Sequence, residues 1–268
     1  MISEKEYQKL LEIVKSAGKI VTGATAIEDG HHIKEKAGTA NFVTTYDVSV
    51  QTYLLKELTA VYPDALFLAE EKENDISCLS APHCFIIDPI DGTTNFIHGC
   101  HHSAISVAMA EGGSLTFAAI LNPYTGELFH ARVGHGAFCG DHPIHVSDRP
   151  LENALVAFGT CPYYKDTLSD MTFAILKDMF LTCGDVRRPG AAALDLAGIA
   201  DGRNDIFFEC ILSPWDYAAG SLLIREAGGI ITSMEATPLD LGRPTSVLAA
   251  TPHIYNEALK IAQKHYKK

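Results

Sequence analysis

No stretch of this 268-residue sequence is apolar over the roughly 20 residues that a helix needs to cross a bilayer. The first residues, MISEKEYQKLLEIV, also lack the basic start and the apolar centre of a secretion signal. The seven cysteines contain no Cys-x-x-Cys pair and are odd in number, which argues against a zinc site or a disulfide framework. We therefore expect a soluble, cytoplasmic protein with reduced thiols and no membrane partner.

Basic charge is also scarce, because the formal net charge at pH 7 is −12. A chain this acidic is poorly suited to a nucleic-acid backbone, so we expect no nucleic acid as its main ligand. An anionic substrate would need positive charge from another source, and a cluster of metal ions would provide it. Hydrophobic residues at 47% and charged residues at 20% are typical of a globular protein.

Helical and strand patterns alternate along the first half of the chain. Apolar residues recur at helical spacing over 4–21 and 47–63, and Pro63 ends the second of these helices. Short apolar runs at 65–69 and 84–87 predict strands. Residues 103–121 predict a hairpin turned at Gly112 and Gly113, and 127–133 extend the meander.

The pattern changes near residue 147. The second half predicts strands at 154–160, 205–209, 229–234 and 246–251, and helices at 169–180, 191–200, 215–229 and the C-terminus. We expect an α+β or α/β protein in which helices are layered on sheets, with two sub-domains at 1–147 and 148–268. The order of the strands does not follow from the pattern.

The most informative stretch is CFIIDPIDGTTNF, residues 84–96. We expect a strand to end at Asp88, where Pro89 fixes φ and removes an amide donor. The carboxylates of Asp88 and Asp91 and the carbonyl oxygen of Ile90 would then converge within four residues. Such hard oxygen donors are the ligands that Mg²⁺ prefers.

The residues after Asp91 suit a phosphate group. Gly92 lets the backbone approach a ligand closely. Thr93 and Thr94 lie where a short helix could begin, and exposed amides at a helix start bind phosphate. A turn capped by these acids and threonines is the alternative, but capping requires neither the proline nor both acids.

The spacing of the two acids distinguishes this stretch from the haloacid dehalogenase signature, Asp-x-Asp-Gly-Thr. Here the order is Asp-x-x-Asp-Gly-Thr, with one additional residue between the acids. Because side chains alternate along a strand, that residue moves the first carboxylate relative to the second. We therefore predict no covalent aspartyl-phosphate intermediate.

Three motifs together resemble the inositol monophosphatase family. They are DPIDGTTNF, the pair of glutamates in FLAEEKEN, and PWDYAAG followed by EAGG. The family comprises Mg²⁺-dependent, lithium-sensitive phosphomonoesterases of the fructose-bisphosphatase-like superfamily, and the similarity covers essentially the full chain. The resemblance implies an α/β/α/β/α layered sandwich, inhibition by Li⁺ and a homodimer.

The resemblance also assigns a metal site and its chemistry. The implied metal ligands are Glu70, Asp88, the Ile90 carbonyl, Asp91 and Asp216. Clustered Mg²⁺ ions would bind the phosphate, activate a water and stabilise the leaving alkoxide. Glu70 is the implied general base, and Thr93 with Asp47 matches the pair that orients the water. Asp47 is equally the natural N-cap of the helix that follows it.

Substrate-side residues are implied in a second group of positions. RRPGAAALD resembles the loop that meets the sugar ring, which proposes Arg187, Gly190 and Ala192, although Arg187 could instead form a surface ion pair. Glu209 matches an acid that accepts hydrogen bonds from ring hydroxyls. Such hydrogen bonds would offset the cost of burying its carboxylate. The resemblance also places Asp91, Gly92, Thr93 and Asp216 against the substrate.

One residue departs from the family pattern, and three histidines suggest a different metal site. Where animal relatives have a histidine two residues before Trp-Asp, this chain has Ser213, which leaves the preference for inositol open. His98, His101 and His102 suggest zinc, but no second ligand pair has suitable spacing, so we predict pocket or surface histidines.

The expected function is thus hydrolysis of inositol monophosphate, or of a similar sugar or polyol phosphate, with Mg²⁺ as cofactor. Fructose 1,6-bisphosphate or a phosphonucleotide is an alternative substrate. A non-catalytic regulatory protein of the transcription machinery is an alternative function. The retention of all five metal-binding groups favours the enzyme, because a non-catalytic protein has no need of them.

Overall fold

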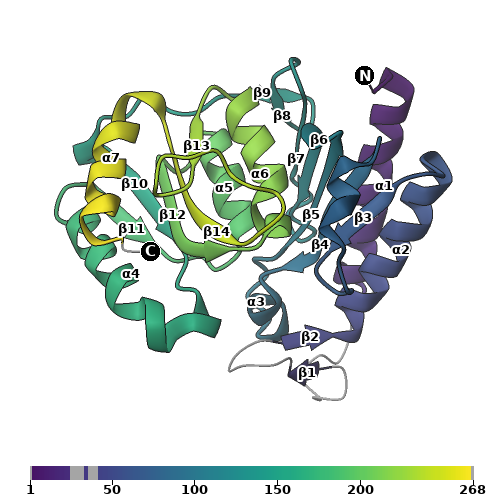
Figure 1. Cartoon of the computed structure of the whole chain (residues 1–268), viewed down its shortest axis with the longest axis horizontal. Coiled ribbons are helices and arrows are strands. Elements are labelled where there is room, and N and C mark those ends of the chain that lie inside the picture. The colour runs from purple at the N-terminus through teal and green to yellow at the C-terminus, as the bar shows by residue number, and fades with distance from the viewer. Residues whose placement is uncertain (1, 25–32, 36–41, 267–268) are drawn as a thin grey trace.

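The structure is a computed structural model that describes residues 2–24, 33–35 and 42–266. Helices and sheets alternate in five layers, which Figure 1 shows edge-on. A helix pair covers one sheet, a second helix pair fills the space between the two sheets, and a third covers the outer face of the second sheet. The predicted α/β/α/β/α sandwich is confirmed.

The first sheet has seven strands in sequential order, and α1 (Glu4–Thr22) and α2 (Thr45–Val61) cover its outer face. Only its first pair of strands is parallel. Its strands are β3 (Leu66–Ala69), β4 (Cys84–Asp91), β5 (Ala104–Glu111), β6 (Ser114–Leu121), β7 (Leu128–Arg132), β8 (Ala137–Cys139) and β9 (His142–Ile144). Every residue of β4 is buried, because helices pack on both faces of this sheet.

The second sheet has five strands in the order β11-β10-β12-β14-β13. They are β10 (Leu155–Phe158), β11 (Asp185–Arg187), β12 (Ile206–Leu212), β13 (Ile230–Thr232) and β14 (Thr245–Ala250). Helices α4 (Lys165–Phe180) and α7 (Pro252–His265) cover its outer face. Smaller elements are β1 (Ile33–Glu35), β2 (Phe42–Thr44), α3 (Thr93–Ile97) and 3₁₀ turns at 76–80, 151–153 and 162–164.

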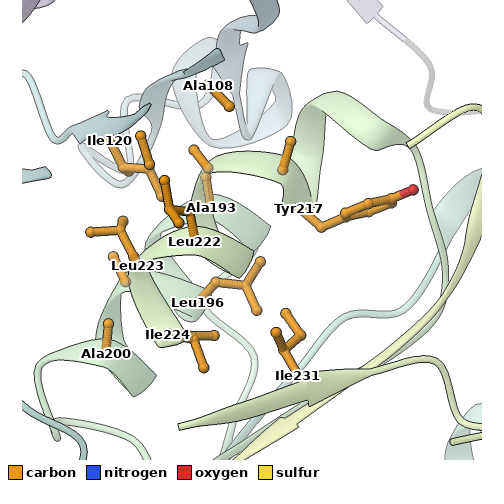
Figure 2. Close-up of a cluster of buried hydrophobic side chains, with 14 of the residues drawn as sticks. Ala108, Ile120, Ala193, Leu196, Ala200, Tyr217, Leu222, Leu223, Ile224 and Ile231 are labelled. Carbon is orange, nitrogen blue, oxygen red and sulfur yellow. The ribbon is translucent and has the colours of Figure 1, made fainter. Parts of the chain in front are cut away.

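The middle layer consists of α5 (Ala192–Ala200) and α6 (Pro214–Glu226). Figure 2 shows their side chains meeting residues of both sheets, from Ala108 and Ile120 on one side to Ile231 on the other. The two sheets divide between residues 144 and 155, but they share this layer and its core. The two sub-domains therefore stay a prediction, and the shared layer fixes how the two halves of the chain meet.

The structure corrects the predicted end of the strand that contains Asp88. β4 does not end at Asp88 but continues to Asp91, whose Cα pairs with Ala104 of β5. The register shifts between Asp88 and Asp91, so Pro89 lies in an irregularity of the strand and not after its end. The edge strand β11 and the hairpin of β8 and β9 were not predicted, because runs of three residues carry too short a pattern.

Among the described residues, no helix is both long and apolar enough to cross a membrane.

The close packing of α5 on α6 gives a stability prediction at Gly220. A Cβ at this position would lie 2.6 Å from both Cβ and Cδ1 of Leu196. Alanine is favoured over glycine inside a helix by about 1 kcal/mol, but overpacking costs about 1–3 kcal/mol. We expect Gly220→Ala to lower the free energy of unfolding, measured by urea denaturation, by about 1 kcal/mol.

The matched control is the same substitution in a Leu196→Gly background, which removes both the Cβ and the Cδ1 that the new methyl group would meet. There Gly220→Ala should become neutral or stabilising, and the two substitutions should be strongly non-additive. Gly220→Ala that stabilises the chain with Leu196 in place would contradict this account of the layer.

Candidate active site

A cleft of about 540 Å³ opens where β4 ends and where three helices begin. The first turns of α3, α5 and α6 all contribute to its wall, through Thr93, Ala192, and Trp215 with Asp216. The amides in the first turn of a helix have no partner within it, and the helix dipole is positive at this end. The cleft is therefore suited to carboxylates and to an anionic ligand.

Three carboxylates meet at the floor of the cleft. Asp88, Asp91 and Asp216 each offer an oxygen, and these oxygens all lie within 4.8 Å of one another. Glu70 and Ile90 line the same cleft. The structure thus brings together all five groups that the resemblance implied as metal ligands, including Asp216, which is 125 residues from Asp91 in the sequence.

Burial and mutual repulsion make these acids hold their protons. Burial is the main cause that raises the pKa of Asp91 to about 7, and the charges of Glu209 and Glu70 add to it. Burial, with the neighbouring acids second, raises the pKa of Asp88 and of Asp216 well above the usual range. A divalent cation would reverse this balance, because it favours the ionised form of every carboxylate around it.

Backbone amides fix each of the three carboxylates. Asp88 Oδ1 accepts a hydrogen bond from the Ile90 amide at 3.0 Å. Asp91 Oδ2 accepts from the Ala193 amide at 2.7 Å, and Asp216 Oδ2 accepts from the Ser213 amide at 2.7 Å. Asp216 thus caps the start of its own helix and also belongs to the carboxylate cluster. A role in capping is therefore compatible with a role as a metal ligand.

The predicted pair of Asp47 and Thr93 also meets. Thr93 Oγ1 lies 3.2 Å from Asp47 Oδ1 and 3.1 Å from the Ile90 carbonyl oxygen. Asp47 is not the N-cap of α2, because Thr44 occupies that position and donates its amide to Asp47 Oδ2 at 2.8 Å. Burial is the main cause that raises the pKa of Asp47 to about 6.

Glu209 also lines the cleft, and its carboxyl group lies in the space left free by Gly159. Glu209 is 7% exposed, and its Oε1 accepts a hydrogen bond from the Cys161 amide at 3.1 Å. A Cβ at Gly159 would lie 1.9 Å from Glu209 Oε2, so any other residue there would displace the carboxyl group. Gly190 and Ala192 line the same part of the cleft.

Arg187 does not reach this cleft, whereas its neighbour does. Arg187 lies on the edge strand β11, is exposed and forms an ion pair with Asp185. Arg188 lines the cleft and donates to Thr160 Oγ1 at 3.1 Å. Successive side chains of an extended chain point in opposite directions, so only one of the two arginines can face the cleft. The geometry favours Arg188 for contact with a ligand.

The three histidine candidates lie outside the cleft, whereas three residues that were not predicted line it. His98, His101 and His102 do not line the cleft, and in the described part of the chain they belong to no group of three metal-binding side chains. Tyr163, Tyr164 and Asp195 do line it, although sequence reasoning did not select them. A usable signal for Asp195 was present, since it is the single charged residue within AAALDLAGIA.

Comparison with known proteins agrees with this fold. The model of the inositol monophosphatase family matches residues 3–267. The chain is 39% identical over 230 residues to the inositol-1-monophosphatase of Rhizobium meliloti, covering 85% of each chain. It is 37% identical over 254 residues to the putative Nus factor SuhB of Neisseria meningitidis serogroup B, covering 94% of this chain and 95% of that one.

A solved structure has a similar fold. The extragenic suppressor protein suhB from Bartonella henselae superposes with a TM-score of 0.87 at 32% identity, over 97% of this chain and 98% of that one. The fold is therefore the inositol monophosphatase fold. The chain belongs to the inositol monophosphatase family.

The environment of Glu209 predicts a pH dependence of stability. Burial is the main cause that raises its pKa from an ordinary 4.5 to about 7, so the folded chain binds this proton more tightly than the unfolded chain. Stability should therefore fall as pH rises through the window from 4.5 to about 7, by about 3 kcal/mol at most from this group. Glu209→Gln should remove that part of the slope in denaturation curves recorded with EDTA.

Glu152→Gln is the matched control, because Glu152 is exposed in the turn before β10. It should leave the slope as it is. A Glu209→Gln chain with an unchanged slope would contradict the assignment of a buried, proton-holding Glu209.

Proposed function

We propose that this protein is a Mg²⁺-dependent phosphomonoesterase that hydrolyses inositol monophosphate, or a similar small sugar or polyol phosphate, to free phosphate. The observation that carries the proposal is the convergence of three carboxylates, two buried and one half-buried, and three helix starts in one cleft. A carboxylate cluster alone would repel a phosphate, so the cluster makes chemical sense with divalent cations between the two. Membership of the family and the relative named inositol-1-monophosphatase support the same reaction.

The donor set fits Mg²⁺, because it consists of carboxylate oxygens and one peptide carbonyl. Glu70, Asp88, the Ile90 carbonyl, Asp91 and Asp216 would hold it. When bound, Mg²⁺ polarises the phosphate, lowers the pKa of a water and neutralises the leaving oxygen. Such an arrangement needs no covalent intermediate with the protein.

The chain's own residues divide the remaining tasks. Gly92, Thr93 and Thr94 line the cleft at the start of α3, where free amides bind phosphate oxygens. Asp47 Oδ1 accepts a hydrogen bond from the Thr93 hydroxyl, which leaves the Thr93 oxygen free to accept a hydrogen bond from the attacking water and so orient it. Glu70 then takes the proton that the water releases.

Recognition of the organic part belongs to the wall that carries Glu209. Glu209 would accept hydrogen bonds from ring hydroxyls, with Gly190 and Ala192 beside it. Arg187 was predicted to share this role, but the lining of the cleft supports Arg188 in its place. Ser213 lines the cleft where animal relatives have a histidine, so the preference among polyol phosphates, fructose 1,6-bisphosphate and phosphonucleotides is set by this wall.

A second function has a specific observation behind it, since a relative matched over 94% of this chain is named a putative Nus factor. Regulation of the transcription machinery is therefore the alternative to catalysis, and release of phosphate with and without Mg²⁺ separates the two. From the family resemblance we also propose a cytoplasmic homodimer that Li⁺ inhibits.

The metal assignment predicts the effect of Asp88→Asn. The substitution keeps the shape of the side chain but removes an anionic ligand, and amides bind Mg²⁺ much less well than carboxylates. We expect phosphate release from inositol monophosphate to fall by about 100-fold or more. The metal-free variant should be at least as stable as the wild type, because one repelling acid has been removed.

Asp166→Asn, at an exposed position in the first turn of α4, should retain wild-type turnover. The metal assignment fails if Asp88→Asn works at near-normal rate in low Mg²⁺.

The division of the cleft into two walls predicts opposite patterns for Glu70 and Glu209. Glu70→Gln should reduce turnover of inositol monophosphate and of p-nitrophenyl phosphate alike, since both need the same activated water. Glu209→Ala should raise KM for inositol monophosphate by about 10- to 150-fold, the loss of one hydrogen bond to a charged group. It should impair p-nitrophenyl phosphate much less, because that substrate offers no ring hydroxyl.

Steady-state kinetics on the two substrates measures both patterns. Equal loss of both activities in Glu209→Ala would mean that Glu209 supports the metal site and not the substrate.

A further inference from the structure

Helix α5 contains one charged residue, and that residue is buried. All nine residues of the helix are buried, and eight of them are Ala, Leu, Gly or Ile. The exception is Asp195, which is 2% exposed. A carboxyl group in such surroundings is costly unless hydrogen bonds or a ligand satisfy it.

Asp195 differs from every other buried acid in the described part of the chain. Each of the others accepts a hydrogen bond from at least one backbone amide: Asp47 from Thr44, Asp88 from Ile90, Asp91 from Ala193, Asp205 from Leu155, and Glu209 from Cys161. Among the described residues, no hydrogen bond or ion pair reaches the Asp195 carboxyl group. A structural role would show such a partner, as it does for Asp205, which also pairs with Arg149.

The start of the helix does not account for Asp195 either. It lies in the first turn of α5, where a negative charge gains from the helix dipole. This gain is small compared with the cost of burying a carboxyl group that lacks a partner. The N-cap is Ala191, and no side chain caps this helix, so Asp195 is not held by a capping box.

The cleft is the one place that the Asp195 carboxyl group can find a partner. Asp195 lines it together with Ala192, which lies three residues earlier on the same face of α5. The negative charges of Asp91 and Glu209 raise the pKa of Asp195, after burial, and the charge of Arg188 lowers it. Asp195 is thus within electrostatic reach of the acid cluster and of the wall proposed to bind the organic part of the substrate.

We propose that Asp195 is a further specificity-determining residue, whose carboxyl group accepts a hydrogen bond from a hydroxyl of the substrate's sugar or polyol ring. This inference rests on the phosphatase function proposed above, and it adds an acceptor to Glu209. Two carboxylates on one wall favour a ligand with several hydroxyls and disfavour a featureless one, because each acid is left unsatisfied without its donor.

The test compares Asp195→Ala and Asp195→Asn on inositol monophosphate, its monodeoxy analogues and p-nitrophenyl phosphate. We expect the ratio of kcat/KM for inositol monophosphate to that for p-nitrophenyl phosphate to fall by about 10- to 150-fold in Asp195→Ala. The fall should be smaller in Asp195→Asn, because the amide oxygen still accepts a hydrogen bond. One monodeoxy analogue should lack the hydroxyl that Asp195 binds, so the wild type should show a kcat/KM for it that is lower than for inositol monophosphate by the same factor. Asp195→Ala should not reduce the kcat/KM for this analogue any further.

Asp201→Asn is the matched control, since Asp201 ends the same helix but pairs with Arg203 at 2.7 Å outside the cleft. It should leave the ratio at the wild-type value. Melting temperature gives an independent readout: without ligand, Asp195→Asn should melt no lower than the wild type, because it removes an unpaired buried charge. The rise in melting temperature on adding inositol monophosphate and Mg²⁺ should be smaller in the variant.

The outcomes separate the two proposals. Normal hydrolysis of p-nitrophenyl phosphate with an unchanged ratio in Asp195→Ala would overturn this inference alone. A lower melting temperature of Asp195→Asn with an unchanged ratio would assign Asp195 a structural role. A wild-type chain that released no phosphate from either substrate with Mg²⁺ would overturn the proposed function, and this inference with it.

Discussion

The mutual repulsion of three carboxylates in a buried space is the constraint on which the site depends. Asp88, Asp91 and Asp216 come together although burial and like charge both oppose their ionisation. Each is held by an amide of a turn or helix start, so the backbone and not a counter-charged side chain fixes the cluster. Fixed acids that cannot neutralise one another are a natural site for a divalent cation, and a bound cation would give this acidic chain the positive charge that the proposed phosphate substrate requires.

The layered fold is what makes that arrangement rigid. α5 and α6 begin at the cleft and then run between the two sheets, with small residues such as Gly220 allowing them to pack closely. The acids of β4 belong to the first sheet, and Glu209 belongs to the second. The middle layer therefore sets the distance between the acids of β4, to which we assign the chemistry, and Glu209, to which we assign recognition of the substrate.

The sequence predicted the local parts of this site well. Asp88, Ile90 and Asp91 lie within four residues, so their convergence follows from one irregular stretch of β4. Asp216 and Glu209 are distant in the chain, and only the family resemblance connected them to that stretch. Arg187 and Arg188 could not be separated, because the direction of each side chain depends on the pairing of β11, whose three residues carry no recognisable pattern. Asp195 was overlooked, because the sequence displays its place as the single charged residue of AAALDLAGIA but not the absence of a partner for its carboxyl group.

The same limit applied to the fold. Helix periods and strand lengths gave the elements, whereas the order β11-β10-β12-β14-β13 depends on long-range pairing that no local pattern encodes. The strand through Asp88 was predicted to end early because proline usually ends a strand. Pairing of Asp91 with Ala104 across an irregular register carried it further.

The central claim is that the carboxylate cluster exchanges protons for Mg²⁺, and calorimetry tests it most directly. Titration of the metal-free protein with Mg²⁺ near pH 6.5, in two buffers of different ionisation enthalpy, measures the protons released on binding. The account predicts saturable binding with release of about one proton or more, since the pKa of Asp91 lies near 7 and those of Asp88 and Asp216 are raised above their usual range. Saturable heat that is the same in both buffers, or no binding at millimolar Mg²⁺, would contradict it.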